Sequence, residues 1–181
     1  MLNVKLYPLQ EEQDSGKMKF YFESIGVKRI TKVVEYSRLK DYYLGGLYNL
    51  GFGDFDYTTL KVADDKNSNN GDMRPVANTV LSTIPLFFEE HPHDSVYVRG
   101  SDSGIKFEMY CWQSCNLSKR PCKGKCRKTD QRINSYRHYL NSNYTQLTES
   151  YIFSGFNAAL ELYLPYQKNT KYDAVIISKK F

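Results

Sequence analysis

The sequence predicts one α+β domain over residues 1–181, built from a mostly antiparallel β-sheet with two main helices and a small cysteine-rich insertion. Three observations predict this class. Alternating apolar and polar residues recur toward both ends of the chain, two stretches carry apolar residues at helical spacing, and all the cysteines cluster together. With 181 residues and 41% hydrophobic side chains, the chain can bury one core without cross-links.

The amino-terminal third is predicted to be β-structure. Residues 17–23 and 29–36 show the period-2 alternation of half-buried strands, and residues 24–26 between them permit a hairpin. Residues 47–54 place two glycines among aromatic side chains, which predicts a structured turn or a bulge. Residues 58–62 predict a further short strand.

The first helix is predicted from Asp72 to about Glu90. Asp72 can accept hydrogen bonds from the free amides of a helix start, and Pro75 suits the first turn because it has no N–H to satisfy. An apolar face recurs at helical spacing through this stretch. Residues 91–94 then predict a polar turn that ends the helix.

Strands and one helix are predicted in the second half. Residues 95–99 and 106–112 are expected to be strands on either side of a turn at residues 100–104. A helix over about residues 129–147 is predicted to bury the stripe Ile133, Tyr136, Leu140, Tyr144 and Leu147. The last three predicted strands are residues 151–156, 161–166 and 172–178, and we expect the helix to pack on the sheet they form.

The positive charge of the chain is concentrated in one segment. Residues 119–137 contain eight basic side chains against Asp130 alone, a net charge of +7, which leaves −2 for the rest of a chain whose total is +5. Such a segment favours a polyanion or an acidic protein surface as partner. A basic loop that serves only solubility is the alternative.

The four cysteines, Cys111, Cys115, Cys122 and Cys126, follow the spacing C-x3-C-x6-C-x3-C. Each pair has the short spacing that lets two thiolates bind one tetrahedral Zn²⁺, and the neighbouring basic residues favour the thiolate form. A four-thiolate site has no open position, so the predicted zinc would be structural. Disulfides, which a reducing cytosol disfavours, and unpaired thiols are the alternatives.

The amino terminus lacks the basic and apolar regions of a secretory signal, and no apolar run approaches the length that spans a bilayer. We therefore expect a cytoplasmic protein without a membrane partner.

Five short motifs are spread over most of the chain after the first hairpin. They are Tyr-Asn-Leu-Gly-Phe-Gly-Asp at residues 48–54, Asn-Gly-Asp at 70–72, Gly-Ser at 100–101, Arg-x-x-x-Tyr-Arg at 132–137 and Tyr-Asp-Ala-Val at 172–175. Together they resemble an uncharacterised family of small bacterial proteins that carries only a domain-of-unknown-function label. The resemblance implies no activity. It does imply that the cysteine-rich, basic residues 104–128 are an insertion, and that Arg132 and Tyr136 lie where the Gly-Ser turn meets a helix start.

The first functional hypothesis is a nucleic-acid-associated module, of the kind found as a toxin-like or regulatory partner in two-gene systems. Tyr110, Trp112, Tyr136 and Tyr139 can stack on bases. Phosphate contacts would come from Arg120, Lys123, Lys125, Arg127, Lys128, Arg132 and Arg137.

Two other functions stay open at this point. One is a ribonuclease-like or phosphate-handling enzyme, in which Arg132 binds phosphate while Tyr136, Ser101 or His138 transfers protons. The other is a protein-interaction module whose basic surface meets an acidic partner, because charge alone does not separate a nucleic acid from an acidic protein.

Overall fold

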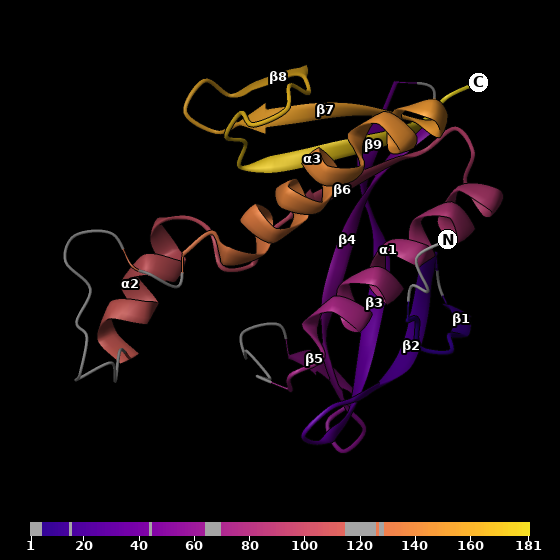
Figure 1. The fold of residues 1–181 in the computed structure, drawn as a ribbon, viewed down its shortest axis with the longest axis vertical. Coiled ribbons are helices and arrows are strands. Elements are labelled where there is room, and N and C mark those ends of the chain that lie inside the picture. Colours follow the sequence, from indigo (N-terminus) through magenta and orange to yellow (C-terminus); the bar gives the residue numbers. More distant parts are fainter. Residues whose placement is uncertain (1–4, 15, 44, 64–69, 115–125, 127–128) are drawn as a thin grey trace. The chain divides into compact units, whose positions relative to one another are not determined.

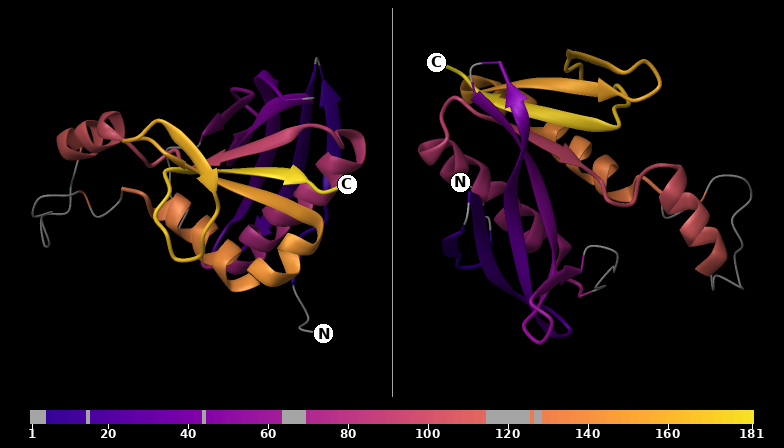
Figure 2. Two further views of the ribbon diagram at one scale, coloured as in Figure 1. Left: turned by 90° about the horizontal axis from the view of Figure 1, so that it is seen from above. Right: turned by 180° about the vertical axis from the view of Figure 1, so that it is seen from behind.

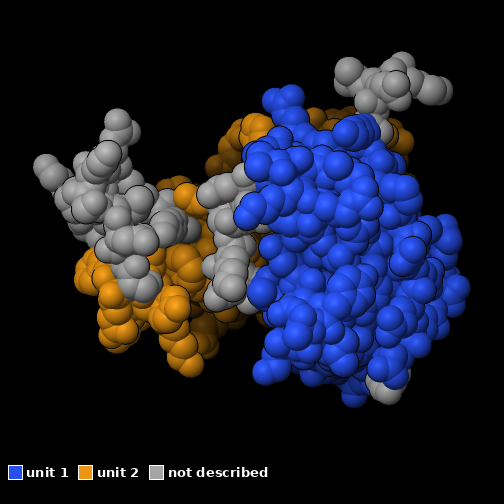
Figure 3. Space-filling model, turned by 90° about the horizontal axis from the view of Figure 1, so that it is seen from below, with its two compact units in different colours: residues 1–96 blue, residues 97–181 orange. Residues whose placement is uncertain are grey.

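The computed structural model describes residues 5–14, 16–43, 45–63, 70–114, 126 and 129–181. The chain divides into two compact units, residues 1–96 and residues 97–181, which Figure 3 colours separately. We call them unit 1 and unit 2. Whether residues 1–181 fold as one domain stays a prediction.

Unit 1 is built on antiparallel strands that pair in chain order (Figure 1). They are β1 (Gln10–Asp14), β2 (Lys17–Ile25), β3 (Arg29–Tyr42) and β4 (Gly45–Asp56), with the short β5 (Lys61–Ala63) paired to β4. The first hairpin is confirmed, with Ile25 opposite Arg29 across its turn. Both of its strands run further than predicted. The buried Ser24 continues the alternation of β2, and residues 37–42 extend β3 by pairing with β4.

The prediction of a turn or bulge over residues 47–54 is wrong, since these residues lie inside β4. The glycines stay in register with β3, where Gly51 is opposite Glu35 and Gly53 is opposite Val33. The irregularity in this ladder is on the partner strand, between Arg38 and Lys40. Pairing along a long strand therefore outweighs the low β-propensity of glycine.

Helix α1 (Met73–Glu90) packs across one face of this sheet (Figure 1, Figure 2). Its buried side chains recur every three or four residues and include Thr83 and Phe87. Phe87 stacks on Tyr36 of β3 with ring centroids 4.5 Å apart, and both side chains have no exposed surface. The core of unit 1 is therefore aromatic, and it lies between α1 and the sheet.

Asp72 does not cap α1 with its side chain, contrary to the prediction. Its Oδ2 instead accepts hydrogen bonds from the Ser24 hydroxyl at 2.6 Å and the Tyr7 hydroxyl at 2.7 Å. Asn70 holds the β2–β3 turn, because its side-chain amide donates to Ser24 Oγ and to the Lys28 carbonyl. The Asn-Gly-Asp motif thus fastens the start of α1 to the first hairpin.

The described residues of unit 2 form two helices and a carboxy-terminal set of antiparallel strands. The elements are α2 (Ile105–Ser114), α3 (Gln131–Ser150), β7 (Tyr151–Asn157), β8 (Leu162–Pro165) and β9 (Ala174–Lys179). Strand β7 pairs with both β8 and β9. The strand β6 (Ser95–Arg99) starts in unit 1 and ends in unit 2. The predicted strand at residues 95–99 and the three terminal strands are confirmed.

The predicted strand over residues 106–112 is wrong, because these residues form α2. Cys111 is buried although the residues on either side of it are exposed, and the half-buried Phe107 lies four residues before it. That spacing brings both onto the same side of a helix. The alternation of polar and apolar residues in this stretch does not indicate a strand, because only one narrow side of the helix is buried.

The predicted packing of the second main helix is confirmed. Ile133 and Leu140 of α3 are 2% and 6% exposed. Tyr144 lies against Phe153 of β7 and stacks on Tyr166, whose carbonyl accepts a hydrogen bond from the Tyr144 hydroxyl. The protein therefore has the α+β class expected, with mostly antiparallel pairing, and α2 is a helix additional to the two predicted.

Within the described residues, none of the helices combines the length and the apolar character that crossing a membrane requires.

Candidate functional site

The turn that follows β6 and the start of α3 meet in unit 2. The Arg132 guanidinium donates from Nη1 to Ser101 Oγ at 2.6 Å, and the Arg132 backbone N–H donates to Asp102 Oδ2 at 2.9 Å. The Asp130 N–H donates to the Asp102 carbonyl, also at 2.9 Å. The Gly-Ser turn and the Arg-x-x-x-Tyr-Arg helix, thirty residues apart in the sequence, therefore converge.

Asp102 acts as the cap of α3. The residue that precedes the helix, Asp130, has a left-handed backbone with φ of 61° and makes no side-chain cap hydrogen bond. The Asp102 carboxylate takes that role by accepting from the N–H of Arg132 in the first turn. A negative charge at a helix amino terminus is also favoured by the helix dipole.

The surroundings of Asp102 are polar and buried. Asp102 and Thr129 are each 8% exposed. Asp102 Oδ1, Ser103 Oγ and Thr129 Oγ1 are buried atoms without a hydrogen-bond partner in the described part of the chain. An anion placed at the start of α3 would meet the Asp102 carboxylate, so this helix start is a poor phosphate site.

Of the proton-transfer candidates Ser101, Tyr136 and His138, Ser101 contacts Arg132, whereas His138 does not join them. Burial raises the pKa of Tyr136, and the charge of Arg132 only partly opposes this, so the phenol is a donor rather than a base at neutral pH. Tyr136 lies one turn after Arg132, on the same side of α3, whereas His138 is six residues after Arg132 and faces another direction. His138 is exposed, and among the described residues no hydrogen bond joins it to Arg132 or Tyr136.

Arg137 is engaged within unit 2. Its Nη1 donates to Asn134 Oδ1 at 3.0 Å, and its Nη2 donates to the Thr170 carbonyl at 2.7 Å. This second bond ties α3 to the loop between β8 and β9. A phosphate would have to compete with both contacts, which makes Arg137 a weaker ligand than the sequence predicted.

Two of the four cysteines lie in the described part of the chain, and they are close together. The sulfurs of Cys111, on α2, and Cys126 are 3.1 Å apart, and the two residues are 4% and 3% exposed. Cys115 and Cys122 lie outside the described residues. The structure therefore brings the outer members of the C-x3-C-x6-C-x3-C pattern together across fifteen residues of sequence.

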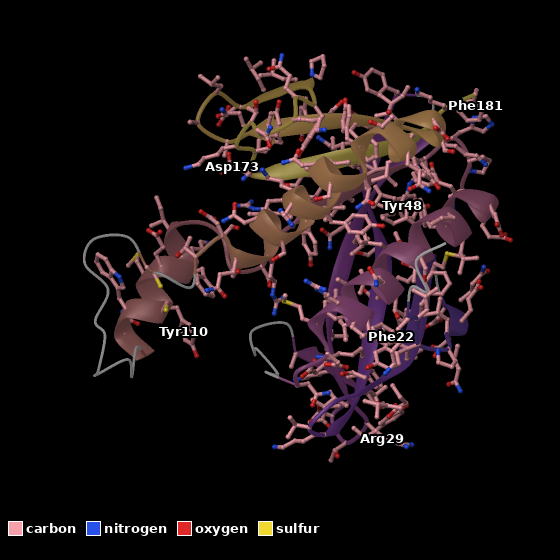
Figure 4. All side chains as sticks on the ribbon, viewed as in Figure 1. Phe22, Arg29, Tyr48, Tyr110, Asp173 and Phe181 are labelled. Carbon is pink, nitrogen blue, oxygen red and sulfur yellow. The ribbon has the colours of Figure 1, made fainter. Side chains whose placement is uncertain are left out.

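Helix α2 presents aromatic and apolar side chains to solvent. Tyr110 and Trp112 are 63% and 60% exposed, and Figure 4 shows the labelled Tyr110 extending from α2. Ile105 and Met109 of the same helix are also exposed. Exposed large aromatic side chains of this kind are typical of surfaces that bind a partner.

The basic segment begins five residues after α2 ends. Its predicted phosphate contacts Arg120, Lys123, Lys125, Arg127 and Lys128 lie outside the described residues. The charge can still be assigned to the units from the sequence. Unit 2 has 14 basic and 6 acidic residues, a net charge of +8, whereas unit 1 has 11 basic and 14 acidic residues, a net charge of −3.

Sequence reasoning missed Asp102, the residue that joins the turn to the helix. The available signal was an acidic residue directly after the Gly-Ser pair at the end of a strand, in a turn that contains several hydroxyl groups. Nothing in the local pattern indicates that this carboxylate caps a helix thirty residues later, because that contact is tertiary.

Residues 3–111 match the family described as a family of unknown function, DUF6934. The match includes the whole described part of unit 1 and reaches α2 at Cys111, and it does not extend to Arg132 or Tyr136. No curated protein matches the chain. No solved structure matches it either.

Proposed function

The chain belongs to this family of unknown function, and from that premise we propose that unit 2 binds nucleic acid through α2 and the basic segment that follows it. The observation that carries the proposal is the exposure of Tyr110 and Trp112 directly before this segment. Aromatic faces stack on unpaired bases while lysine and arginine neutralise phosphates. The net charge of +8 on unit 2 supports the same surface.

Two features favour single strands over sequence-specific duplex reading. Stacking on an exposed aromatic ring requires an unpaired base, and a helix as short as the ten residues of α2 offers few side chains to read base edges. The proposed role is that of a toxin-like or regulatory partner in a two-gene system. A growth defect on induced expression, relieved when the basic segment is reversed in charge, would support that role.

The binding experiment is a titration of purified protein with labelled single-stranded RNA and with duplex DNA at several salt concentrations. We expect micromolar or tighter binding to the single strand, with each removed basic contact lowering the log–log salt slope by about 0.7 to 0.9. The double variant Arg120→Glu with Lys123→Glu should abolish binding. The matched charge reversal Lys168→Glu with Lys171→Glu, on the loop between β8 and β9, should retain it.

A second pair of variants tests stacking. Trp112→Ala should weaken binding by about 1–3 kcal/mol, the usual value of one base on one aromatic ring. Tyr57→Ala removes an aromatic side chain of similar exposure, 67%, from unit 1 and should have no effect. If neither nucleic acid binds better than micromolar, while Arg120→Glu with Lys123→Glu still abolishes the biological effect, an acidic protein partner replaces the nucleic acid.

We propose further that Cys111, Cys115, Cys122 and Cys126 hold one structural Zn²⁺. The convergence of the Cys111 and Cys126 sulfurs supports this, because a tetrahedral site needs the first and last ligands of the pattern to meet. Bound zinc would hold Cys111 of α2 beside Cys126, which lies five residues before α3 begins at Gln131. Elemental analysis of protein purified without chelator should give one zinc per chain, and clearly substoichiometric zinc would contradict the proposal.

The ribonuclease-like use of Arg132, Tyr136 and His138 is not the function we propose for unit 2. Asp102 occupies the start of α3 with a negative charge, and His138 faces away from Arg132. Arg132 is better suited to positioning the Gly-Ser turn.

A further inference from the structure

A separate group of ionisable side chains lies in unit 1, where α1 ends beside the β3–β4 hairpin. The turn after α1 closes with the Asp94 N–H donating to the His91 carbonyl at 3.2 Å. Within that turn, His91 Nδ1 lies 2.9 Å from Asp94 Oδ2. The other carboxylate oxygen, Oδ1, accepts a hydrogen bond from the Gly46 N–H. Asp94 is thus held by the backbone of β4 while it contacts the histidine.

The imidazole of His91 is fixed in orientation. Its ring stacks on Phe87 with centroids 4.8 Å apart and an interplanar angle of 19°, and the Tyr48 ring lies 5.1 Å away. Donation from Nδ1 to a carboxylate leaves Nε2 as the basic nitrogen. The side chain is 31% exposed, and within the described residues Asp94 is its only hydrogen-bond partner.

Arg38 of β3 lies on the same surface. A methyl group added to Gly46 would be 2.8 Å from Arg38 Nε, 3.0 Å from the Tyr48 ring and 3.4 Å from Asp94 Oδ1, so these three groups surround one backbone position. The only ion pair of Arg38 in the described chain is with Asp41, whose side chain is 89% exposed. Such a pair is worth little and is readily exchanged for a ligand anion.

The Tyr48 phenol stays protonated in this group. Burial raises the pKa of Tyr48, the nearby charge of Asp94 raises it further, and Arg38 opposes both. The ionisable groups of this surface are therefore Asp94 and His93 from the turn, Tyr48 from β4, and Arg38 with Asp41 from β3. Of the two imidazoles on this surface, His91 is the one that contacts Asp94.

We propose that this surface is an acid–base site that cleaves RNA, with His91 as general base, Arg38 binding the phosphate and Asp94 as the residue that positions the imidazole. The surface offers a base and a cation, which suits a phosphodiester substrate that carries its own nucleophile. The 2′-hydroxyl of RNA is such a group. Histidine, arginine and aspartate come together here although Arg38 and His91 are 53 positions apart in the sequence.

The proposed step is an internal transfer. The 2′-hydroxyl gives its proton to His91 Nε2, O2′ forms a bond to phosphorus, and the bond from phosphorus to O5′ breaks. The leaving 5′-oxygen takes a proton from water, and the imidazolium returns its proton to the hydroxide that remains. The products are a 2′,3′-cyclic phosphate and a free 5′-hydroxyl. Arg38 neutralises charge on the phosphate as it develops.

The test is cleavage of a dinucleoside monophosphate, which is too short to need the basic segment of unit 2. We expect the full-length protein to produce the cyclic phosphate, and the 2′-deoxy analogue to resist cleavage. His91→Gln should lower kcat/KM by roughly 10²- to 10⁴-fold. Arg38→Ala should raise KM, and Asp94→Asn should lower kcat and shift the acidic limb of the pH–rate profile. His138→Gln, the exposed histidine of α3, is the matched control and should leave the rate unchanged.

Far-UV circular dichroism and the thermal midpoint of each variant separate loss of chemistry from loss of fold. If Asp94→Asn unfolds because it also holds Gly46, His91→Gln and the rescue of His91→Gly by added imidazole still decide the question. The double variant Arg120→Glu with Lys123→Glu should retain dinucleotide cleavage, so this site and the proposed binding by unit 2 can fail independently. No cyclic product from the unsubstituted protein, or equal cleavage by His91→Gln, overturns the proposal.

Discussion

Replacing Asp72 by alanine removes the acceptor at the centre of the network that joins α1 to the first hairpin. Asp72 Oδ2 accepts from the hydroxyls of Ser24 and Tyr7, which are 0% and 5% exposed. A buried donor left without an acceptor costs about 1–3 kcal/mol. The Tyr7 hydroxyl also lies 3.3 Å from the Ile25 carbonyl and can still donate to it. The loss of Asp72 as an acceptor for Tyr7 is therefore expected to cost an amount at the lower end of this range.

The two contributions together predict that Asp72→Ala lowers the free energy of unfolding by about 2–4 kcal/mol. Urea denaturation followed by circular dichroism measures this, as a lower midpoint at an unchanged slope. The matched control is Asp41→Ala, which removes an 89% exposed carboxylate in a surface ion pair and should cost less than about 1 kcal/mol. An Asp72→Ala protein within 0.5 kcal/mol of the control, on this scale of surface effects, would refute the reasoning.

Three further predictions concern pH and packing. Burial alone would raise the pKa of Asp72, but the hydrogen bonds from Ser24 and Tyr7 and the charge of Lys32 lower it below its ordinary value of 3.8. The stability that this lowered pKa gives is complete above the ordinary value and is lost as the pH falls through the folded pKa. In denaturation curves, the stability difference between the natural protein and Asp72→Asn should therefore shrink below about pH 4 and not at pH 6. Leu140→Ala should cost about 2–5 kcal/mol by the same assay, because Leu140 is only 6% exposed, whereas Gln146→Ala at an exposed position of the same helix should stay within about 0.5 kcal/mol. Gly155→Ala would place a methyl group 2.2 Å from the ring of the buried Tyr172, so we expect a loss of about 1–3 kcal/mol in the thermal or urea midpoint, and an unchanged midpoint would show that the ring can move away.

The sequence by itself was sufficient for elements whose burial follows a regular period. The β2–β3 hairpin, α1, α3 and the terminal strands each repeat apolar residues at the spacing of one element type, and each was predicted. The concentration of positive charge in residues 119–137 is likewise a property of the sequence, and the two units divide the charge in the same direction. Covalent order and side-chain type determine these features without reference to any distant residue.

Two elements were mispredicted because a local pattern was ambiguous. In β4, Gly51 and Gly53 resembled turn residues, and only their pairing with a long neighbouring strand makes them part of a ladder. In α2, polar and apolar letters alternate, but the helix buries Cys111 on one side and leaves Trp112 exposed. Glycine propensity and short alternation are weak signals that neighbouring strands and partial burial override.

The long-range contacts of both candidate sites were decided by tertiary structure alone. Asp102 caps α3 from thirty residues away, and the local turn that pairs His91 with Asp94 meets Gly46 and Arg38, more than forty residues earlier. Local sequence determines whether a side chain is a base, an acid or a cation, because that is its covalent chemistry. Which of them meet depends on strand register and on where α1 and α3 begin and end, and these are set by the packing of the whole unit.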